Sequence, residues 1–333
     1  MPLNNKTKFK LILGLGNKDI KSALEVALLY AKAGVRFFDA SPEILPELSK
    51  GLIKLGFNRD DFTLCASAPI LGDIHGRKAF ISESICSGCS LCMKNCPEDA
   101  VYKNKKSGKY EIDSKKCIGC SACKKITNCY AISFEYSNGE INSLKKLIDE
   151  GFKIDMAELH ASISDKKQII KDFKDILTFF RGDISVCINR RQFPLDDTVK
   201  LLKELKRLHS VSNTQNSDNS SEFYVQADGA SMNGGDSSDD STLECVLFAK
   251  ELAPYGFNLI VSGGTNNNTP KILNDIMSED DEYNMPVIAY GTYARKLISG
   301  LPPKEALIKA KVLFEETENY DRYDRRDSTV SIG

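Results

Sequence analysis

The sequence predicts an α/β fold: a (β/α)8 barrel of the TIM type, with a small α+β domain inserted after the third strand. Eight short apolar segments alternate with amphipathic segments along the 333 residues, as in parallel sheets whose strands are buried on both faces. A cysteine-rich segment interrupts this alternation after the third apolar segment. A doubly wound sheet has the same alternation. Glycines after the last two apolar segments favour the barrel, because barrels often bind phosphate there.

Apolar runs of strand length define the expected strands, and amphipathic periodicity defines the helices. The strands are Lys10–Leu15, Val35–Ala40, Phe62–Ser67, Ile154–His160, Ile184–Asn189, Phe223–Ala227, Leu259–Ser262 and Val287–Tyr290. The helices include Ile20–Ala33, Lys166–Phe180, Asp196–His209, Thr242–Leu252 and Pro303–Glu316. We therefore expect residues 8–72 and 141–316 to form the barrel, residues 73–140 the inserted domain, and residues 317–333 a disordered tail.

Composition excludes several classes of partner. With 41% apolar residues and no apolar run of membrane-spanning length, the chain can bury a large core and is expected not to enter a membrane. A net charge of -1 gives no overall field for nucleic acid or an anionic membrane.

Eight of the eleven cysteines fall between positions 86 and 129, in two runs. The runs are Cys86-x2-Cys89-x2-Cys92-x3-Cys96-Pro97 and Cys117-x2-Cys120-x2-Cys123-x5-Cys129. Thiolates separated by two residues on a tight turn converge on one iron-sulfur cube, whereas a cysteine after an x3 gap serves a neighbouring cube. The spacing therefore predicts iron-sulfur clusters.

Zinc sites and disulfides are the alternatives for these cysteines. The third cysteine of each run and the Cys96-Pro97 pair argue against zinc, and the segment has no histidine for a mixed zinc site. Residues 1–10 have neither the apolar core nor the cleavage site of a secretory signal. We therefore expect a reducing, cytoplasmic location, in which disulfides are rare.

Residues 80–137 resemble the bacterial two-cluster ferredoxin domain, in which each cysteine run leads into a Pro-x-x-Ala-Ile/Val segment. The first half fits, but Thr127 occupies the position of the last cysteine in the second half, and Cys129 comes two residues late. The resemblance implies two [4Fe-4S] clusters with exchanged fourth ligands, one on Cys117, Cys120, Cys123 and Cys96, the other on Cys86, Cys89, Cys92 and Cys129. If Cys129 does not reach, the second would be a [3Fe-4S] centre or a four-iron centre with an exchangeable iron.

Two cubes in one small domain usually conduct single electrons, and the alternatives are a structural or a sensing role. The basic run Lys103–Lys109 lies between the two cysteine runs. We interpret it as a solvated hairpin loop, with docking of an acidic redox partner protein as the alternative.

Turns after the last two predicted strands indicate an anion site. The residues concerned are Gly263, Gly264 and Thr265 after the seventh strand, and Gly291, Thr292 and Arg295 after the eighth. Glycines let backbone N–H groups approach a phosphate, and a helix start adds a favourable partial charge. The turns therefore suit FMN or another phosphate-containing ligand. Alternatively, the glycines only make tight turns and Arg295 forms a salt bridge within its helix.

Polar side chains at the carboxyl ends of the predicted strands are candidate catalytic residues, because barrels carry their chemistry there. Glu158 and His160 alternate onto one face of the fourth strand. Other strand ends add Asn17, Asp39, Asn189, Arg190, Gln226 and Asp228. Together these residues are expected to line a polar pocket with an acid/base histidine and a carboxylate that orients it. The remaining cysteines, Cys65, Cys187 and Cys245, are expected to be buried, inert thiols.

From about residue 8 to residue 300 the chain also resembles the light-dependent-period protein family. The resemblance rests on ordered motifs: Lys10–Gly14, Glu158–His160, Gln226–Gly229, Met232, Gly234–Asp236, Gly263–Asn266 and Gly291–Leu297. It implies ferredoxin-type clusters in the N-terminal half and a link to redox input into a circadian clock. It carries over no catalytic residues.

Two functions remain open. In the first, the chain is a redox sensor or electron-transfer adaptor whose barrel is a platform for a partner. In the second, it is an oxidoreductase that binds a flavin or phosphorylated ligand at the barrel's carboxyl end and receives electrons from the clusters. The first is preferred because no indisputable catalytic set is present, and whether the chain is an enzyme stays open.

Overall fold

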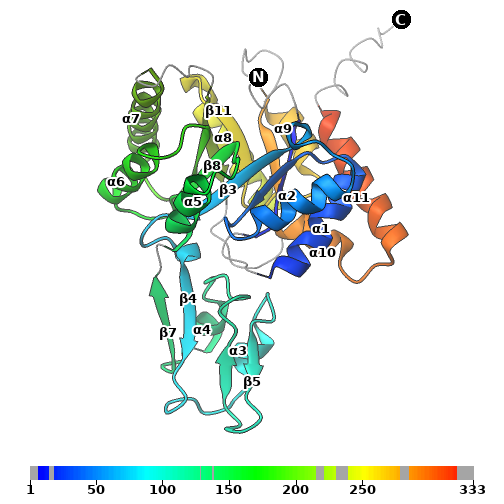
Figure 1. The fold of residues 1–333 in the computed structure, drawn as a ribbon. Coiled ribbons are helices and arrows are strands. Elements are labelled where there is room, and N and C mark those ends of the chain that lie inside the picture. Colours follow the sequence, from blue (N-terminus) through cyan, green and yellow to red (C-terminus); the bar gives the residue numbers. More distant parts are fainter. Residues whose placement is uncertain are drawn as a thin grey trace, which may run out of the picture.

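The computed structural model describes residues 7–14, 19–127, 129–136, 139–214, 221–229, 239–277 and 285–320. Eight parallel strands close into a barrel in the order β1-β12-β11-β10-β9-β8-β3-β2 (Figure 1). They are β1 (Phe9–Ile12), β2 (Phe37–Ala40), β3 (Thr63–Pro69), β8 (Met156–His160), β9 (Asp183–Asn189), β10 (Phe223–Asp228), β11 (Asn258–Ser262) and β12 (Val287–Tyr290). The predicted barrel is confirmed, and the doubly wound alternative is wrong.

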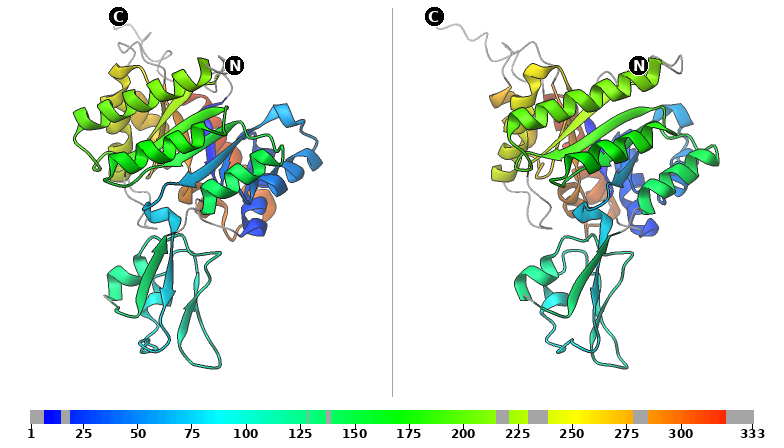
Figure 2. Two further views of the ribbon diagram at one scale, coloured as in Figure 1. Left: turned by 60° about the vertical axis from the view of Figure 1, so that its left-hand side comes forward. Right: turned by 90° about the vertical axis from the view of Figure 1, so that its left-hand side faces the viewer.

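Helices cover the outside of the barrel (Figure 2). They are α1 (Ile20–Ala33), α2 (Leu45–Lys54), α5 (Gly139–Asp149), α6 (Lys166–Leu177), α7 (Leu195–Thr214), α8 (Asp239–Leu252), α9 (Thr269–Ile276), α10 (Thr292–Ile298) and α11 (Pro303–Glu318). Local signals set their ends. The Asp19 carboxylate accepts the Ser22 N–H at 3.3 Å before α1, and Gly34 ends α1 with φ +124°, a conformation that favours glycine.

A second lobe lies between β3 and β8 in the chain. Strand β4 (Arg77–Ile81) pairs antiparallel with β7 (Ile132–Tyr136), and β5 (Val101–Lys103) pairs with β6 (Tyr110–Ile112). The short helices α3 (Leu91–Lys94) and α4 (Ala122–Thr127) complete it. We call residues 77–136 the cysteine lobe. It extends away from the end of the barrel at which β3 ends (Figures 1 and 2).

The inside of the barrel has two chemically different levels. The first level is apolar and holds a buried cluster of Phe37, Cys65, Met156, Tyr224, Ile260, Val287 and Ala289. Charged and polar side chains fill the second, towards the carboxyl ends of the strands; Lys10, Asp39, Glu158 and Gln226 are all buried there. Buried charges require partners, so the candidate barrel site lies at this second level.

The end of the chain differs from the sequence prediction. Helix α11 continues to Glu318, and the buried Tyr320 donates its hydroxyl to the Pro286 carbonyl at 2.6 Å. Residues 317–320 therefore belong to the fold, and the rest of the predicted tail lies outside the described residues, as does Asn17. None of the helices that the structure describes has the length and apolar character needed to cross a lipid bilayer.

Candidate iron-sulfur centre and barrel site

The eight clustered cysteines line two separate hollows in the cysteine lobe. Cys96, Cys117, Cys120 and Cys123 line one hollow. Cys86, Cys89, Cys92 and Cys129 line the second. Each hollow thus takes three cysteines from one run and the fourth from the other. No disulfide joins any two of the eleven cysteines, all of which lie in the described part of the chain.

The two runs fold into the same local turn. Gly88 and Gly119 precede the second cysteine of each run, with φ +74° and +71°, and Ser90 and Ser121 follow it, with φ +66° and +68°. Successive residues of this kind curve the backbone so that its N–H groups face a concavity, as in many iron-sulfur sites. The Cys-x-Gly-Cys-Ser-x-Cys sequence common to both runs therefore encodes two similar cradles.

The lobe supplies what an iron-sulfur cluster needs from a protein. The Ala100 N–H donates to Cys96 Sγ at 3.2 Å, and such bonds help to set cluster potential. Burial, and then the neighbouring Cys120 and Cys117 thiols, raise the pKa of Cys123 to about 12. A thiolate there needs a cation beside it, so binding of iron would release protons. The residues present fit the group that their spacing predicts.

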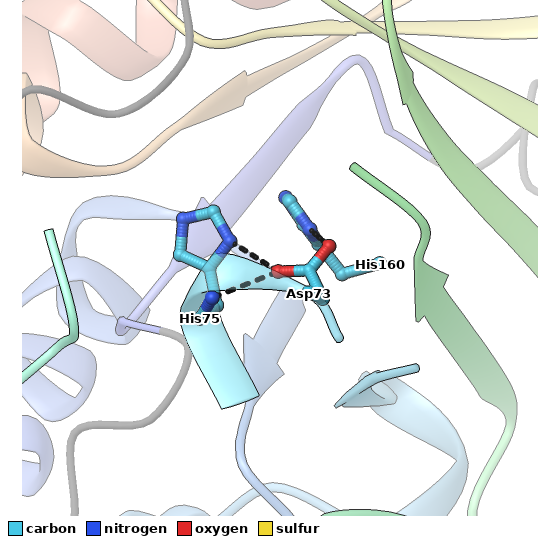
Figure 3. Close-up of side chains that lie close together, drawn as sticks. All are labelled: Asp73, His75 and His160. Atoms are coloured by element: carbon cyan, nitrogen blue, oxygen red, sulfur yellow. Dashed lines mark hydrogen bonds and ion pairs between the residues drawn. The ribbon is translucent and has the colours of Figure 1, made fainter. Parts of the chain in front are cut away.

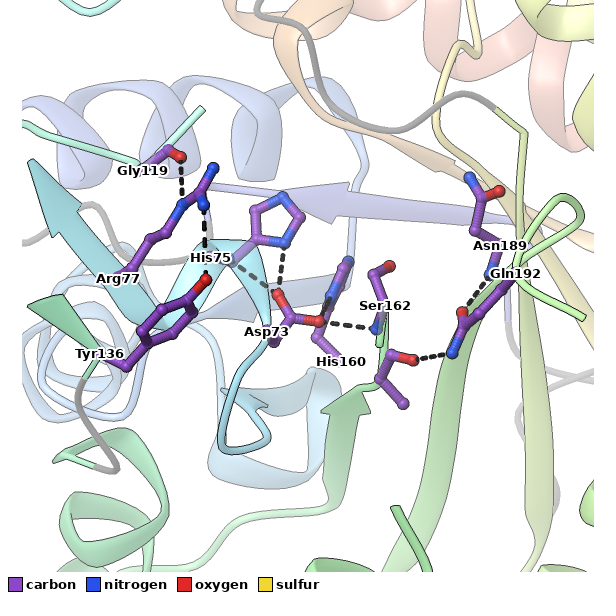
Figure 4. A network of polar contacts seen from close by, with 10 residues as sticks. Asp73, His75, Arg77, Gly119, Tyr136, His160, Ser162, Asn189 and Gln192 are labelled. Atoms are coloured by element: carbon purple, nitrogen blue, oxygen red, sulfur yellow. Dashed lines mark hydrogen bonds and ion pairs between the residues drawn. The ribbon is translucent and has the colours of Figure 1, made fainter. Parts of the chain in front are cut away.

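Arg77, the first residue of β4, holds the turn of the second cysteine run. Its Nε donates to the Gly119 carbonyl at 3.1 Å (Figure 4). Nη2 donates to Ser121 Oγ, and the guanidinium lies 4.3 Å from the centre of the Phe134 ring. Arg77 directly follows the 3₁₀ turn Ile74–Gly76, which leads out of the barrel. The turn between Cys117 and Cys120 is therefore fixed against the chain segment that leaves β3.

That same segment places Asp73 and His75 beside His160 at the end of β8. Asp73 Oδ1 lies 2.9 Å from His75 Nδ1, and Asp73 Oδ2 lies 2.9 Å from His160 Nδ1 (Figure 3). The imidazole rings meet edge to face, with centroids 4.1 Å apart. Burial opposes the charged form of His160, but Asp73 and then Cys187 together outweigh burial, and the pKa of His160 lies well above its usual range.

Glu158 is paired with a buried lysine. The fully buried Lys10 ammonium donates to Glu158 Oε2, lies 2.5 Å from Asp39 Oδ2 and donates to Gln226 Oε1 at 2.8 Å. Burial, and then Glu158, raise the pKa of Asp39 to about 7. Asp73 is therefore the carboxylate that orients His160, and Glu158 belongs to the group around Lys10.

Sequence reasoning missed Asp73, His75 and Lys10. Asp73 and His75 lie in a connection with no periodic pattern, so only the folded chain brings them to His160. Lys10 did carry a signal, because a lysine within a short apolar strand demands a buried counter-charge. Of the other strand-end residues, Asn189 donates to the Gly229 carbonyl at 3.2 Å. Arg190 instead pairs with Glu251 at 2.5 Å.

The glycines of the predicted anion site lie at the ends of the neighbouring strands β11 and β12. A Cβ at Gly263 would lie 1.4 Å from Asp228 Oδ1, and one at Gly264 would lie 2.5 Å from Ser241 Cβ. Close packing therefore already requires both glycines. At Gly291 the nearest atom, Ile12 Cβ, would be 3.8 Å away, so that glycine has no such packing reason.

The other predicted anion ligands are held by protein groups. Thr265 Oγ1 donates to the Ala289 carbonyl at 2.6 Å. Arg295 Nη1 donates to the Ile12 carbonyl at 3.2 Å, and Nη2 donates to Thr292 Oγ1 at 3.2 Å. Nη2 also lies 3.8 Å from Glu98 Oε1. Arg295 thus pairs with Glu98 of the cysteine lobe. The salt bridge predicted as its alternative role was expected within its own helix, and Glu98 lies outside that helix.

Comparison with solved structures finds long but distant likenesses. A protein assigned to the dihydrodipicolinate synthase family from Coccidioides immitis is 10% identical, with 96% of this chain and 73% of that chain covered and a TM-score of 0.44. Mycobacterium tuberculosis tryptophan synthase is 10% identical, with 95% of this chain and 94% of that chain covered and a TM-score of 0.43. Orotidine 5'-phosphate decarboxylase from Pyrococcus horikoshii OT3 is 13% identical, with 92% of this chain and 98% of that chain covered and a TM-score of 0.38. Likenesses at this level carry no functional argument.

No curated protein matches the chain in sequence, but two protein-family models do. A 4Fe-4S dicluster domain matches residues 78–129, which identifies the chain as an iron-sulfur protein. The light dependent period A C-terminal domain matches residues 147–321. Because this second match spans more than half of the 333 residues, the chain belongs to the light dependent period A family.

Proposed function

We propose that this chain relays or senses single electrons through two clusters in its cysteine lobe, and that its barrel is a platform for a partner protein or a ligand. The observation that carries the proposal is the crosswise grouping of the eight cysteines into two sets of four. On this proposal residues 73–140 are an iron-sulfur domain inserted into a barrel of residues 8–72 and 141–316, and the protein works in the reducing cytoplasm.

Each set of four cysteines would hold one [4Fe-4S] cluster, which supplies one-electron oxidation and reduction. Cys129 lines the same hollow as Cys86, Cys89 and Cys92, which favours four thiolates there over the three of a [3Fe-4S] centre. Lysines contact both cradles. Lys109 Nζ donates to the Cys86 carbonyl and Lys78 Nζ donates to the Cys117 carbonyl, so positive charge lies beside each set of sulfurs.

The lobe also has the surface that a redox partner needs. Cys89 is itself exposed, and large apolar side chains of the lobe are exposed too: Ile85, Leu91, Met93, Tyr102 and Tyr130. Lys103, Lys105 and Lys106 are exposed on the β5–β6 hairpin. Apolar contact and positive charge together fit an acidic redox partner protein that docks near the cluster of Cys86, Cys89, Cys92 and Cys129.

The experiment is EPR with iron, sulfide and flavin quantification on protein purified without oxygen, as isolated and after dithionite reduction. Two four-iron clusters require about eight irons per chain and two interacting signals after reduction. About four irons, or a [3Fe-4S] signal in the oxidised protein, would contradict ligation by Cys129. Absence of cluster iron after reconstitution would overturn the proposal.

An oxidoreductase is the second candidate, and one contact favours it. The turn between Cys117 and Cys120 packs against the segment that carries Asp73 and His75, and these residues contact His160 at the barrel's carboxyl end. A flavin or phosphorylated ligand bound at that end, near Gly291, Thr292 and Arg295, would lie on the side of the barrel that faces the clusters. Stoichiometric flavin in the same preparation would support this candidate, and iron-sulfur absorption alone would favour the adaptor.

A further inference from the structure

Three buried side chains at the carboxyl end of the barrel have the composition of a transition-metal site. They are His160 on β8, Cys187 on β9 and Asp228 on β10, with exposed fractions of 6%, 1% and 3%. One ligand atom from each lies within 4.8 Å of the other two. Imidazole, thiolate and carboxylate are the three ligand types that zinc takes in proteins.

The strand register explains why these three meet. His160 is the register partner of Cys187 across β8 and β9. Cys187 pairs in turn with Gln226, and Asp228 lies two residues further along β10, so alternation returns it to the same face. Three neighbouring strands therefore present one donor each to the inside of the barrel. Donors on paired strands are held more precisely than donors on loops.

Asp73 has the position of an outer group that orients a metal-binding histidine. Oδ1 accepts the His75 N–H at 2.8 Å and faces His75 Nδ1, while Oδ2 accepts the Ser162 N–H at 2.7 Å and faces His160 Nδ1 (Figures 3 and 4). With both oxygens occupied, Asp73 fixes His160 Nδ1 and leaves Nε2 as the nitrogen for coordination. A carboxylate behind the histidine is usual at zinc sites.

Outside the cysteine lobe, two other groups of potential ligands lie in the described part of the chain, and both are disfavoured. Asp39, Cys65 and Glu158 are close enough together, but the Lys10 ammonium already lies against both carboxylates, so a second cation would be repelled. Asp73, His75 and His160 also form a group, but the Asp73 oxygens and both Nδ1 atoms are engaged with one another. Only the donors of His160, Cys187 and Asp228 remain.

We propose that His160 Nε2, Cys187 Sγ and the Asp228 carboxylate bind one divalent transition-metal ion, with zinc as the best match to this donor set. Three protein ligands leave the fourth tetrahedral position for water or a ligand, as in catalytic zinc sites. The buried Cys187 would then be a ligand rather than an inert thiol. The site is independent of the clusters in the cysteine lobe and of their function.

The test measures zinc in the anaerobically purified, cluster-loaded full chain after incubation with one equivalent of Zn²⁺ and desalting. We expect about one zinc per chain, and X-ray absorption at the zinc edge should show a single sulfur at about 2.3 Å with nitrogen or oxygen at about 2.0–2.2 Å. This edge is separate from that of iron, so the clusters do not obscure it. Four sulfurs per zinc would place the ion on the cysteine lobe and overturn the proposal.

Matched variants locate the ion. Cys187→Ser, His160→Gln and Asp228→Asn should each lower zinc retention at least tenfold. Cys245→Ser and His209→Gln, which change a buried cysteine and a buried histidine outside this donor group, should retain it. Far-UV circular dichroism should match wild type in all five, which shows that the barrel folds, and cluster iron should match as well. Equal zinc in the ligand variants and the controls, or no retained zinc in wild type, would overturn the proposal.

Discussion

Gly119, between Cys117 and Cys120, lies so close to Ile74 that a Cβ added to it would be 2.4 Å from the Ile74 carbonyl oxygen. The same Cβ would lie 2.5 Å from the Arg77 carbonyl oxygen. One cluster cradle and the segment that leaves the barrel are therefore in backbone contact, and this contact depends on the absence of a side chain.

Gly119→Ala should displace that cradle, whereas Gly88→Ala is its matched control. Gly88 has nearly the same φ, but its nearest neighbour, the Gly108 carbonyl oxygen, would be 3.7 Å from a Cβ. Both changes cost about 1–2 kcal/mol for the left-handed backbone, and Gly119→Ala adds about 1–3 kcal/mol of overpacking. Thermal loss of cluster absorbance without oxygen measures the difference. Equal loss in the two variants would mean that the contact with Ile74 is unimportant.

Cys96→Ser should disturb the cluster of the second run, although Cys96 belongs to the first, because it lines the hollow of Cys117, Cys120 and Cys123. Iron content in double variants reveals the grouping. Cys96→Ser with Cys117→Ser removes two ligands of one cluster, so it should lose little more iron than Cys96→Ser alone. Cys96→Ser with Cys86→Ser should disturb both clusters, with a loss approaching about eight irons. The opposite pattern would refute the crosswise grouping.

Lys10→Met should strongly destabilise the barrel. Met has a similar length but leaves Asp39 and Glu158 as two buried acids without their cation. Removing one partner of a buried ion pair typically costs about 3–5 kcal/mol of unfolding free energy. Lys50→Met is the control, because the Lys50–Glu47 pair is exposed and exposed ion pairs contribute little to stability. Urea unfolding measures both, and a similar small loss in the two variants would argue against a structural role for the Lys10 group.

Asp39 should make stability depend on pH. Burial, and then Glu158, raise its folded-state pKa from 3.8 to about 7, so the folded protein binds this proton more tightly than the unfolded chain. The stabilisation is complete below about pH 4 and is lost as the pH rises to about 7, with a slope of at most about 1.4 kcal/mol per pH unit. Asp39→Asn should remove this slope. If the unfolding free energies of wild type and Asp39→Asn changed equally with pH between about pH 5 and pH 8, the raised pKa would be contradicted.

Local patterns and long-range contacts differ in what a sequence reveals. The eight strands and α1 follow from apolar runs and amphipathic periodicity, because each pattern is contained in its own segment. Asp73 could not be assigned to His160, because their 2.9 Å contact joins residues 87 positions apart through a connection without periodicity. Cys129 shows the same limit. Its two-residue displacement left its ligand role open, and only the path of the chain after α4 brings it to the hollow of Cys86, Cys89 and Cys92.

Gly291→Ala tests anion binding without disturbing the fold. Gly263 and Gly264 are unsuitable for this purpose, because a Cβ at either would collide with Asp228 or Ser241, so loss of binding would only report unfolding. At Gly291 a Cβ has room, yet it would project where a phosphate at the start of α10 must approach the backbone. If FMN or inorganic phosphate binds there, Gly291→Ala should weaken binding about tenfold, measured by calorimetry, with an unchanged melting temperature. Unchanged affinity together with an unchanged melting temperature would place the ligand elsewhere. A lowered melting temperature would show that Gly291, like Gly263 and Gly264, is required for packing.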